Sequence, residues 1–162
     1  MFRILYFAVI AVLIILDRLS KHIAAGALAQ GRTVDFLFGL FRFRYVENTG
    51  AAFSSFAGNR VILIVFTSLV IILCLFVLLA GKVKSKFASA CLLLIVAGGI
   101  GNLIDRIISG FVIDFIEPMF MNFAVFNVAD IFITVGAFML IFYEVYLLIK
   151  EKSQGKKTEN DD

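Results

Sequence analysis

Four long apolar runs constrain this chain more than any other feature. Residues 61–80 carry no charged side chain, and residues 4–16, 87–104 and 125–149 are almost as apolar. A helix needs about 20 such residues to cross roughly 30 Å of hydrocarbon. The 162-residue chain is 62% hydrophobic and 17% charged, against about half and a quarter in a soluble domain. We therefore predict an all-α membrane protein, a bundle of four transmembrane helices at about residues 4–26, 61–80, 87–106 and 126–149.

The first apolar run is too short to span a membrane by itself. Residues 4–16 rise only about 20 Å as a helix, so the helix must continue past Asp17 to about residue 26. Lys21 lies four residues after Asp17, on the same helical face, where the two can pair. The alternative is a cleaved signal peptide beginning at Arg3, but the charged block at 17–22 fits that reading poorly.

The segment from residue 31 to 59 has a different character. Residues 41–45 alternate aromatic and cationic side chains, which predicts a strand with one aromatic and one basic face, suited to a membrane surface. Asn48 to Gly50 reads as a turn. Residues 110–114 and 119–126 are also β-prone, so we expect them to pair with this strand in a small sheet outside the bilayer.

Four spans place both termini on one side of the membrane. The short loop 82–86 carries three lysines, and such loops remain in the cytoplasm. Asp17, Asp114 and Asp130 then lie together at the outer end of the bundle. We expect residues 1–150 to form one membrane domain and residues 151–162 a polar, disordered cytoplasmic tail.

Several classes of function find little support in the composition. The tail lysines flank a membrane span rather than form a nucleic-acid patch. Cys74 and Cys91 lie within different apolar runs, where they serve as packing residues. His22 is the only histidine and has no partner motif, so we expect no metal site, no cofactor and no serine–histidine nucleophile.

Polar residues gather near hydrocarbon between residues 98 and 130, where they are costly unless paired or functional. Asp114 and Asp130 flank one loop and can reach the same end of the bundle, where they could share a proton and activate water as aspartic proteases do. Capping explains Asp130 as well, with Asn127 as N-cap three residues earlier. Asp105 and Arg106 read as an interfacial charge pair.

Two further interpretations remain open from the residues alone. One is a small transporter or ion-conducting protein with intramembrane aspartates; the other is an assembly protein whose polar groups only lock helix packing. A transporter needs polar groups along a path across the bilayer. Residues 61–80 offer only Thr67, Ser68 and Cys74, which argues against such a path.

Five ordered motifs give the chain a specific resemblance. It resembles the type II signal peptidases, the lipoprotein signal peptidases of bacteria. The motifs are DRLSK at 17–21, NTGAAF at 48–53, GGIGNLIDR at 98–106, GFVIDF at 110–115 and FNVAD at 126–130.

The resemblance implies a multi-pass protein of the bacterial cytoplasmic membrane, with cytoplasmic termini and an antiparallel β-sheet cradle on the outer face. It implies an aspartic endopeptidase that removes signal peptides from prolipoproteins, cleaving before a cysteine that carries diacylglycerol. Its partners are this lipidated substrate and membrane lipids, and we expect a monomer. The catalytic dyad maps onto Asp114 and Asp130. Residues that would support the site or contact substrate are Asp17, Lys21, Asn48, Gly50, Asn102, Arg106, Asn127 and Ala129.

The chain departs from the family's usual pattern at two positions. Arg18 stands where the family often has glutamine, which alters the charge near the substrate entrance. Ala124 stands where proline is common, which loosens the preceding loop. Neither position belongs to the expected dyad.

Overall fold

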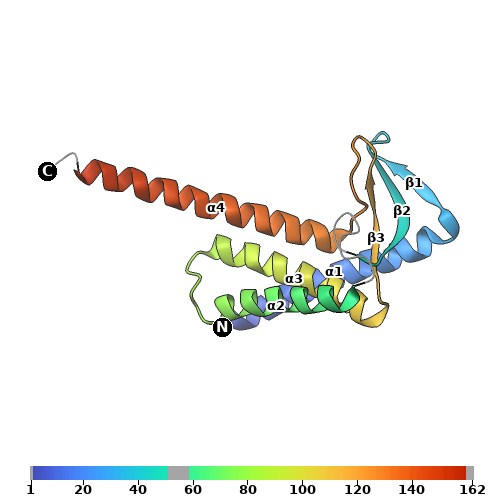
Figure 1. Ribbon diagram of the computed structural model, residues 1–162, viewed down its shortest axis with the longest axis horizontal. Coiled ribbons are helices and arrows are strands. Elements are labelled where there is room, and N and C mark those ends of the chain that lie inside the picture. Colours follow the sequence, from blue (N-terminus) through green and yellow to red (C-terminus); the bar gives the residue numbers. More distant parts are fainter. Residues whose placement is uncertain (1, 51–58, 160–162) are drawn as a thin grey trace.

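The structure is a computed structural model that describes residues 2–50 and 59–159. Helices run lengthwise in Figure 1, and a three-stranded sheet stands across one end of them. The elements are α1 (Phe2–Ala27), η1 (Ala29–Gly31), β1 (Thr33–Phe36), β2 (Phe41–Asn48), α2 (Arg60–Leu79), α3 (Lys86–Ile108), β3 (Val112–Pro118) and α4 (Val128–Glu159).

Helix α3 is the centre of the bundle and packs against α1, α2 and α4. In the most apolar 18-residue stretch of each helix, 61% of α3 is buried, compared with 17% of α2 and 6% of α4. Val96 and Ala97 of α3 are fully buried and belong to one core with Ile10 of α1 and Ile71 of α2. The outer helices therefore turn broad apolar faces outward, as helices in contact with hydrocarbon do.

Among the described residues, three helices are long and apolar enough to cross a membrane: α2, α3, and α4 over Val128–Gln154. Helix α1 has 26 residues, but Asp17, Arg18 and Lys21 interrupt its apolar sequence. Its predicted continuation past Asp17 is confirmed. Asp17 and Lys21 are buried inside the bundle, so α1 packs as part of the helical core.

The other helix boundaries lie close to those predicted, except at the C-terminus. Helix α4 begins at Val128 and continues to Glu159, so the prediction of a disordered tail is wrong as far as residue 159. Lysine, glutamate and glutamine are good helix formers, and the tail contains no proline to stop the helix. Figure 1 shows α4 extending well beyond α2 and α3.

The predicted strand at residues 41–45 is confirmed as part of β2, the middle strand of an antiparallel sheet ordered β1-β2-β3. Phe43 pairs with Val34 and Ile116 on one face, whereas Arg42 pairs with Asp35 and Glu117 on the other. The predicted aromatic and basic faces are therefore present over this part of the strand.

Two features of the sheet differ from the prediction. Strand β1 was not predicted, and residues 119–126 form no strand, although Phe126 forms a bridge with Ile116 and Met119 bonds to Leu40. Pro118 ends β3 because it has no N–H for a further ladder bond. Leu28, just after α1, packs with Phe115 of β3, which holds the sheet against the end of the bundle.

The close approach of α3 and α4 generates a first prediction. A Cβ on Gly98 would meet the Ala129 carbonyl oxygen and lie 2.8 Å from Cγ1 of Ile133. Gly98→Ala should therefore lower stability by about 1–3 kcal/mol through overpacking. Thermal unfolding in detergent measures this, with Gly26→Ala as control because a Cβ there meets nothing within 4 Å. Equal melting temperatures for the two variants would contradict the close packing.

Candidate active site

A buried ammonium group organises the polar end of the bundle. Lys21 is 1% exposed, and its Nζ donates to Asp17 Oδ2 and to Asn102 Oδ1, both at 2.9 Å. The same Nζ lies 2.8 Å from Oδ2 of Asp105, whose other oxygen pairs with Arg18. Two cations thus balance two carboxylates beside the hydrocarbon-facing helices, which is the condition for burying charge.

These contacts confirm one predicted pair and correct another. Asp17 and Lys21 pair as expected from their spacing. The expected interfacial pair of Asp105 and Arg106 is not formed. Successive residues on a helix point about 100° apart, so Asp105 turns to α1 while Arg106 donates to the carbonyl of Gly50 at 2.9 Å.

Asp17 also joins α1 to the first turn of α4. Its Oδ1 accepts a hydrogen bond from the backbone N–H of Ala129 at 3.1 Å. Gly101 of α3 lies against the same carboxylate, and any side chain there would collide with it. The absence of a side chain at Gly98 and Gly101 therefore lets three helices meet around Asp17.

The predicted helix cap at the start of α4 is confirmed. The backbone N–H of Asp130 donates to Asn127 Oδ1 at 3.0 Å, and the N–H of Asn127 donates to Asp130 Oδ2 at 3.1 Å. This reciprocal pair is a capping box. Nδ2 of Asn127 makes further bonds, to Asp114 Oδ1 at 2.6 Å and to Asn102 Oδ1 at 3.2 Å. The cap thus links the two aspartates that the spacing singled out.

Each oxygen of these two carboxyl groups accepts a hydrogen bond. Asn48 Nδ2 donates to Asp114 Oδ2, and Asn102 Nδ2 donates to Asp130 Oδ1, both at 2.8 Å. Asn127 serves the remaining oxygen of each. Four asparagine donors, three from side chains and one from the backbone of Asn127, therefore hold the two carboxyl groups.

The predicted turn at Asn48 is also present. The N–H of Gly50 donates to Asn48 Oδ1 at 2.9 Å, which orients the Asn48 amide towards Asp114. Residues 51–53, the rest of that motif, lie outside the described residues. All the site residues expected from sequence nevertheless meet in one network: Asp17, Lys21, Asn48, Gly50, Asn102, Arg106, Asp114, Asn127, Ala129 and Asp130.

Burial sets the electrostatics of Asp114, which is 1% exposed. Loss of hydration raises the pKa of Asp114 from 3.8 to about 6, with the nearby charge of Asp130 as the second cause. Hydrogen bonds from Asn48 and Asn127 lower this pKa and so limit the rise. The carboxyl group can therefore carry a proton at mildly acidic pH.

The aspartates line a cavity of about 660 Å³. Its polar end holds both carboxyls with Asn48, Asn102 and Arg106. The remaining walls are mostly apolar and come from α2, α4 and the loop before α4: Leu63, Phe66, Thr67, Phe123, Ala124, Ile131, Thr134 and Val135. This lining was not predicted from the sequence, because the same apolar residue types line a cavity and face lipid.

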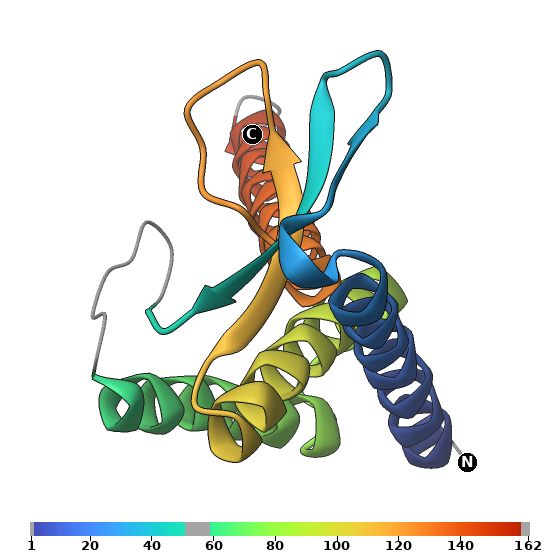
Figure 2. The same cartoon turned by 90° about the vertical axis from the view of Figure 1, so that its right-hand side faces the viewer.

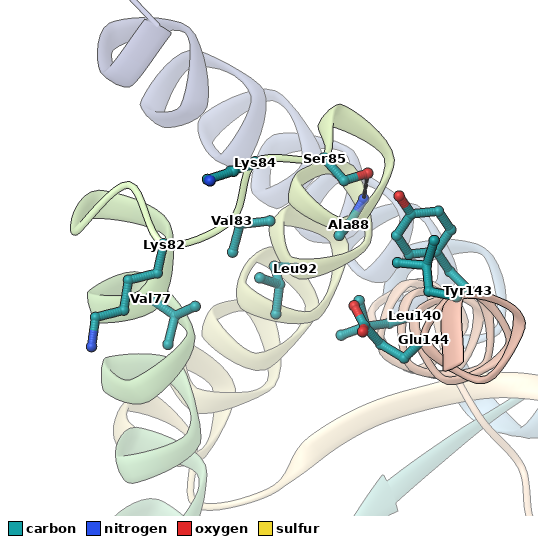
Figure 3. Close-up of a pocket in the computed structure, with 11 residues that line it drawn as sticks. Val77, Lys82, Val83, Lys84, Ser85, Ala88, Leu92, Leu140, Tyr143 and Glu144 are labelled. Carbon is teal, nitrogen blue, oxygen red and sulfur yellow. Dashed lines mark hydrogen bonds between the residues drawn. The ribbon is translucent and has the colours of Figure 1, made fainter. Parts of the chain in front are cut away.

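A second cavity, of about 690 Å³, lies at the other end of α2 and α4. Figure 3 shows Val77, Leu92 and Leu140 within it, with Lys82 at one side and Glu144 at the other. Among the described residues that line it, Glu144 is the only carboxylate, so the paired acids of the first cavity have no counterpart there. Among the described residues, no group of three His, Cys, Asp or Glu side chains converges to hold a metal ion.

Comparison with known proteins decides the family. A family model described as Signal peptidase (SPase) II matches residues 9–146. The chain belongs to the signal peptidase II family. It is 35% identical to the lipoprotein signal peptidase of Enterococcus faecalis, with 97% of each chain covered. It is 40% identical to that of Streptococcus pyogenes serotype M2, covering 88% of this chain and 91% of the relative.

Solved structures agree with this membership. One described as "Bacterial membrane enzyme structure by the in meso method at 2.3 A resolution" superposes with a TM-score of 0.81 and 26% identity, covering 92% of this chain and 90% of the other. As a signal peptidase II, the chain is a membrane aspartic peptidase that removes signal peptides from prolipoproteins. The transporter alternative receives no support.

The raised pKa of Asp114 predicts a pH-dependent stability. The folded protein holds this proton more tightly than the unfolded chain, so the resulting stabilisation is complete below about pH 4 and is lost as pH rises past about 6. The shift corresponds to about 3 kcal/mol. Asp114→Asn cannot ionise, so its stability should fall less than wild type between pH 4 and 7.

Unfolding temperatures measured across this pH range provide the test. Asp35→Asn is the matched control, because Asp35 lies on the same sheet with a side chain that is 57% exposed. Identical pH slopes for the two variants and wild type would show that Asp114 is not the group responsible.

Proposed function

We propose that Asp114 and Asp130 are the catalytic dyad of this signal peptidase. The observation that carries the proposal is their linkage through Asn127 at the polar end of an otherwise apolar cavity. Two carboxyls so placed can share one proton, so that one partner is ionised and the other protonated. This is the state that hydrolysis of a peptide bond by an activated water requires.

The mechanism needs both protonation states. The ionised carboxylate takes a proton from water as the water oxygen attacks the scissile carbonyl carbon. The protonated partner donates to the carbonyl oxygen, giving a neutral tetrahedral intermediate. Collapse breaks the C–N bond: the amine takes the proton that came from water, while the other carboxylate takes a proton from a hydroxyl of the intermediate, which becomes the new carboxyl group. One proton is again shared between Asp114 and Asp130 at the end of the cycle.

The surrounding network has a positioning role in this proposal. Asn48, Asn102 and Asn127 hold the carboxyl oxygens, and Lys21 holds Asn102 through its side-chain oxygen. Such preorganised dipoles need little rearrangement as charge moves in the reaction. Lys21 and Asp17 thus act through Asn102 and Ala129 rather than on the substrate.

The apolar part of the cavity suits the hydrophobic segment of a signal peptide. Phe66 of α2 and Ile131 of α4 line it, so the substrate would enter laterally from lipid and unwind near the dyad. Arg106 faces the same cavity and is 9% exposed, and within the described part of the chain its Nε has no hydrogen-bond partner. We propose that this N–H binds a backbone carbonyl of the unwound substrate.

The same proposal includes the membrane arrangement. Helix α1 is the fourth span, because Asp17 and Lys21 are neutralised inside the bundle and the partly exposed Arg18 pairs with Asp105. The lysines of the α2–α3 loop support cytoplasmic termini, which place the dyad near the outer face of the bacterial cytoplasmic membrane. There it would cleave before a diacylglyceryl-cysteine, beneath the Phe41–Tyr45 strand. We also propose that the protein acts as a monomer.

Substitution of the dyad tests the proposal directly. Asp114→Asn and Asp130→Asn should each lower cleavage of a lipidated prolipoprotein by about 100-fold or more, since each removes one proton-transfer group. Asp35→Asn should retain wild-type activity. The purified protein is reconstituted in bilayers with the precursor, and the rate at which the shortened product appears is measured on a gel. Wild-type rates in a folded dyad variant would refute the assignment, and equal cleavage of the unlipidated precursor would refute lipid dependence.

The dependence of kcat/KM on pH is a separate prediction. The active dyad carries one proton, and the Asp114 pKa of about 6 implies that kcat/KM falls as the pH rises beyond that value. Asn48→Ala removes a hydrogen bond that lowers this pKa, so the alkaline fall should move to higher pH. A profile that is flat, or unmoved in Asn48→Ala, would contradict the shared proton.

A further inference from the structure

Two loops beyond the helices form an exposed apolar surface that the catalytic proposal does not use. We name it the apolar tip. It comprises Leu37, Phe38 and Leu40 between β1 and β2, and Met119, Phe120 and Met121 after β3. Phe38 is completely exposed, and the other five side chains are 43–60% exposed. Figure 2 shows both loops projecting away from the helices on the same side.

The two loops are joined to one another. The N–H of Met119 donates to the carbonyl of Leu40 at 2.8 Å. The ring of Phe120 packs edge-on against Phe41, with centroids 5.6 Å apart. The apolar tip is therefore one structural unit rather than two independent loop ends.

The backbone of the tip is strained in a way that presents Phe38 outward. Leu37 and Phe38 have φ angles of 48° and 56°, a region that bulky L-residues seldom occupy. Residues in strained backbone conformations cluster at functional sites. Nothing in the described chain covers the Phe38 ring, so an apolar environment for it must come from outside the protein.

The charge pattern identifies that environment. Residues 36–41 and 118–123 contain no charged side chain. On the sheet beside the tip, the face opposite Phe43 carries two ion pairs, Asp35 with Arg42 and Glu117 with Arg44, each at 2.8 Å. An apolar aromatic edge backed by a polar face matches the boundary between lipid headgroups and acyl chains. The protein is already a membrane protein, so this surface continues its lipid-facing sides.

We propose that the apolar tip inserts into the bilayer interface on the dyad side and sets the height of the active site, a role that rests on the proposed function. The tip is covalently close to both aspartates: Met119 follows β3, which carries Asp114, and its loop leads to Asn127 and Asp130. Anchoring the tip therefore holds the dyad at the depth where a lipidated cysteine meets water. The occupant is phospholipid rather than substrate chains or a second copy of the protein.

The absence of tryptophan from this chain permits a site-specific test. Phe38→Trp introduces a single tryptophan, excited selectively at about 295 nm, at the tip, and Thr33→Trp places one on the charged face of β1 as a matched control. In vesicles of brominated phospholipid without substrate, the Phe38→Trp variant should emit at shorter wavelength than the Thr33→Trp variant. Its fluorescence should also be quenched about twofold more, because an interfacial indole lies near the brominated chains. Aqueous iodide should quench the Thr33→Trp variant more strongly.

Other quenching patterns would overturn the proposal. Equal quenching of the two variants by brominated lipid would place the tip in water. Quenching of the Phe38→Trp variant only after lipidated substrate is added would make the substrate chains the occupant. A blue shift that depends on protein concentration at fixed lipid ratio would indicate a second copy. None of these readouts uses catalysis, so they can fail while the dyad assignment stands.

Activity tests the second half of the proposal. Phe38→Ser removes the anchor without touching the polar network, so cleavage of lipidated precursor should fall about tenfold in bilayers and remain unchanged in detergent micelles. Retained activity in bilayers would show that insertion does not set the height of the dyad. Equal losses in both media would point to damage to the fold instead.

Discussion

The buried ammonium of Lys21 is the interaction on which the rest of the site depends. A lone charge beside hydrocarbon is very costly, so Lys21 must be surrounded by acceptors, and the structure supplies Asp17, Asp105 and Asn102. This requirement draws α1 against α3. It also fixes the Asn102 amide with its oxygen towards Lys21 and its nitrogen towards Asp130. The need to neutralise Lys21 therefore also fixes the position of the Asp130 carboxyl group, through Asn102.

Asn127 links the capping of α4 to the position of the two aspartates. Capping the first turn of α4 is a local requirement of helix formation, because the first N–H groups have no partners within the helix. Asn127 and Asp130 meet it together. The spare N–H of the same amide reaches Asp114, so the start of a helix and the proposed catalytic pair are one structure. Capping and catalysis, which compete as explanations of Asp130 in the sequence, are compatible in the fold.

Much of the site could be predicted because its motifs are strongly restricted in composition. The spacing of Asp17 and Lys21, the cap at Asn127 and the turn at Asn48 all follow local rules, and each is present. Two of the wrong or missed predictions, the Asp105–Arg106 pair and strand β1, depend on partners that are distant in the sequence. Asp105 and Arg106 are adjacent and opposite in charge, yet their directions differ on the helix and each meets a different partner. The strand at Thr33–Phe36 has too short a pattern to detect without its neighbour.

The sequence by itself determined that this is a helical membrane protein with acidic and amide groups gathered at one end, since apolar length and periodicity are properties of single segments. Only the tertiary structure decided which groups touch. Asn48, Asn102 and Asn127 come from three separate parts of the chain, and no local rule aims them at two carboxyls. The cavity between α2 and α4 was equally beyond the sequence, because an apolar side chain satisfies lipid and substrate alike. The packing of the other helices around α3 decides which apolar side chains line the cavity and which face lipid.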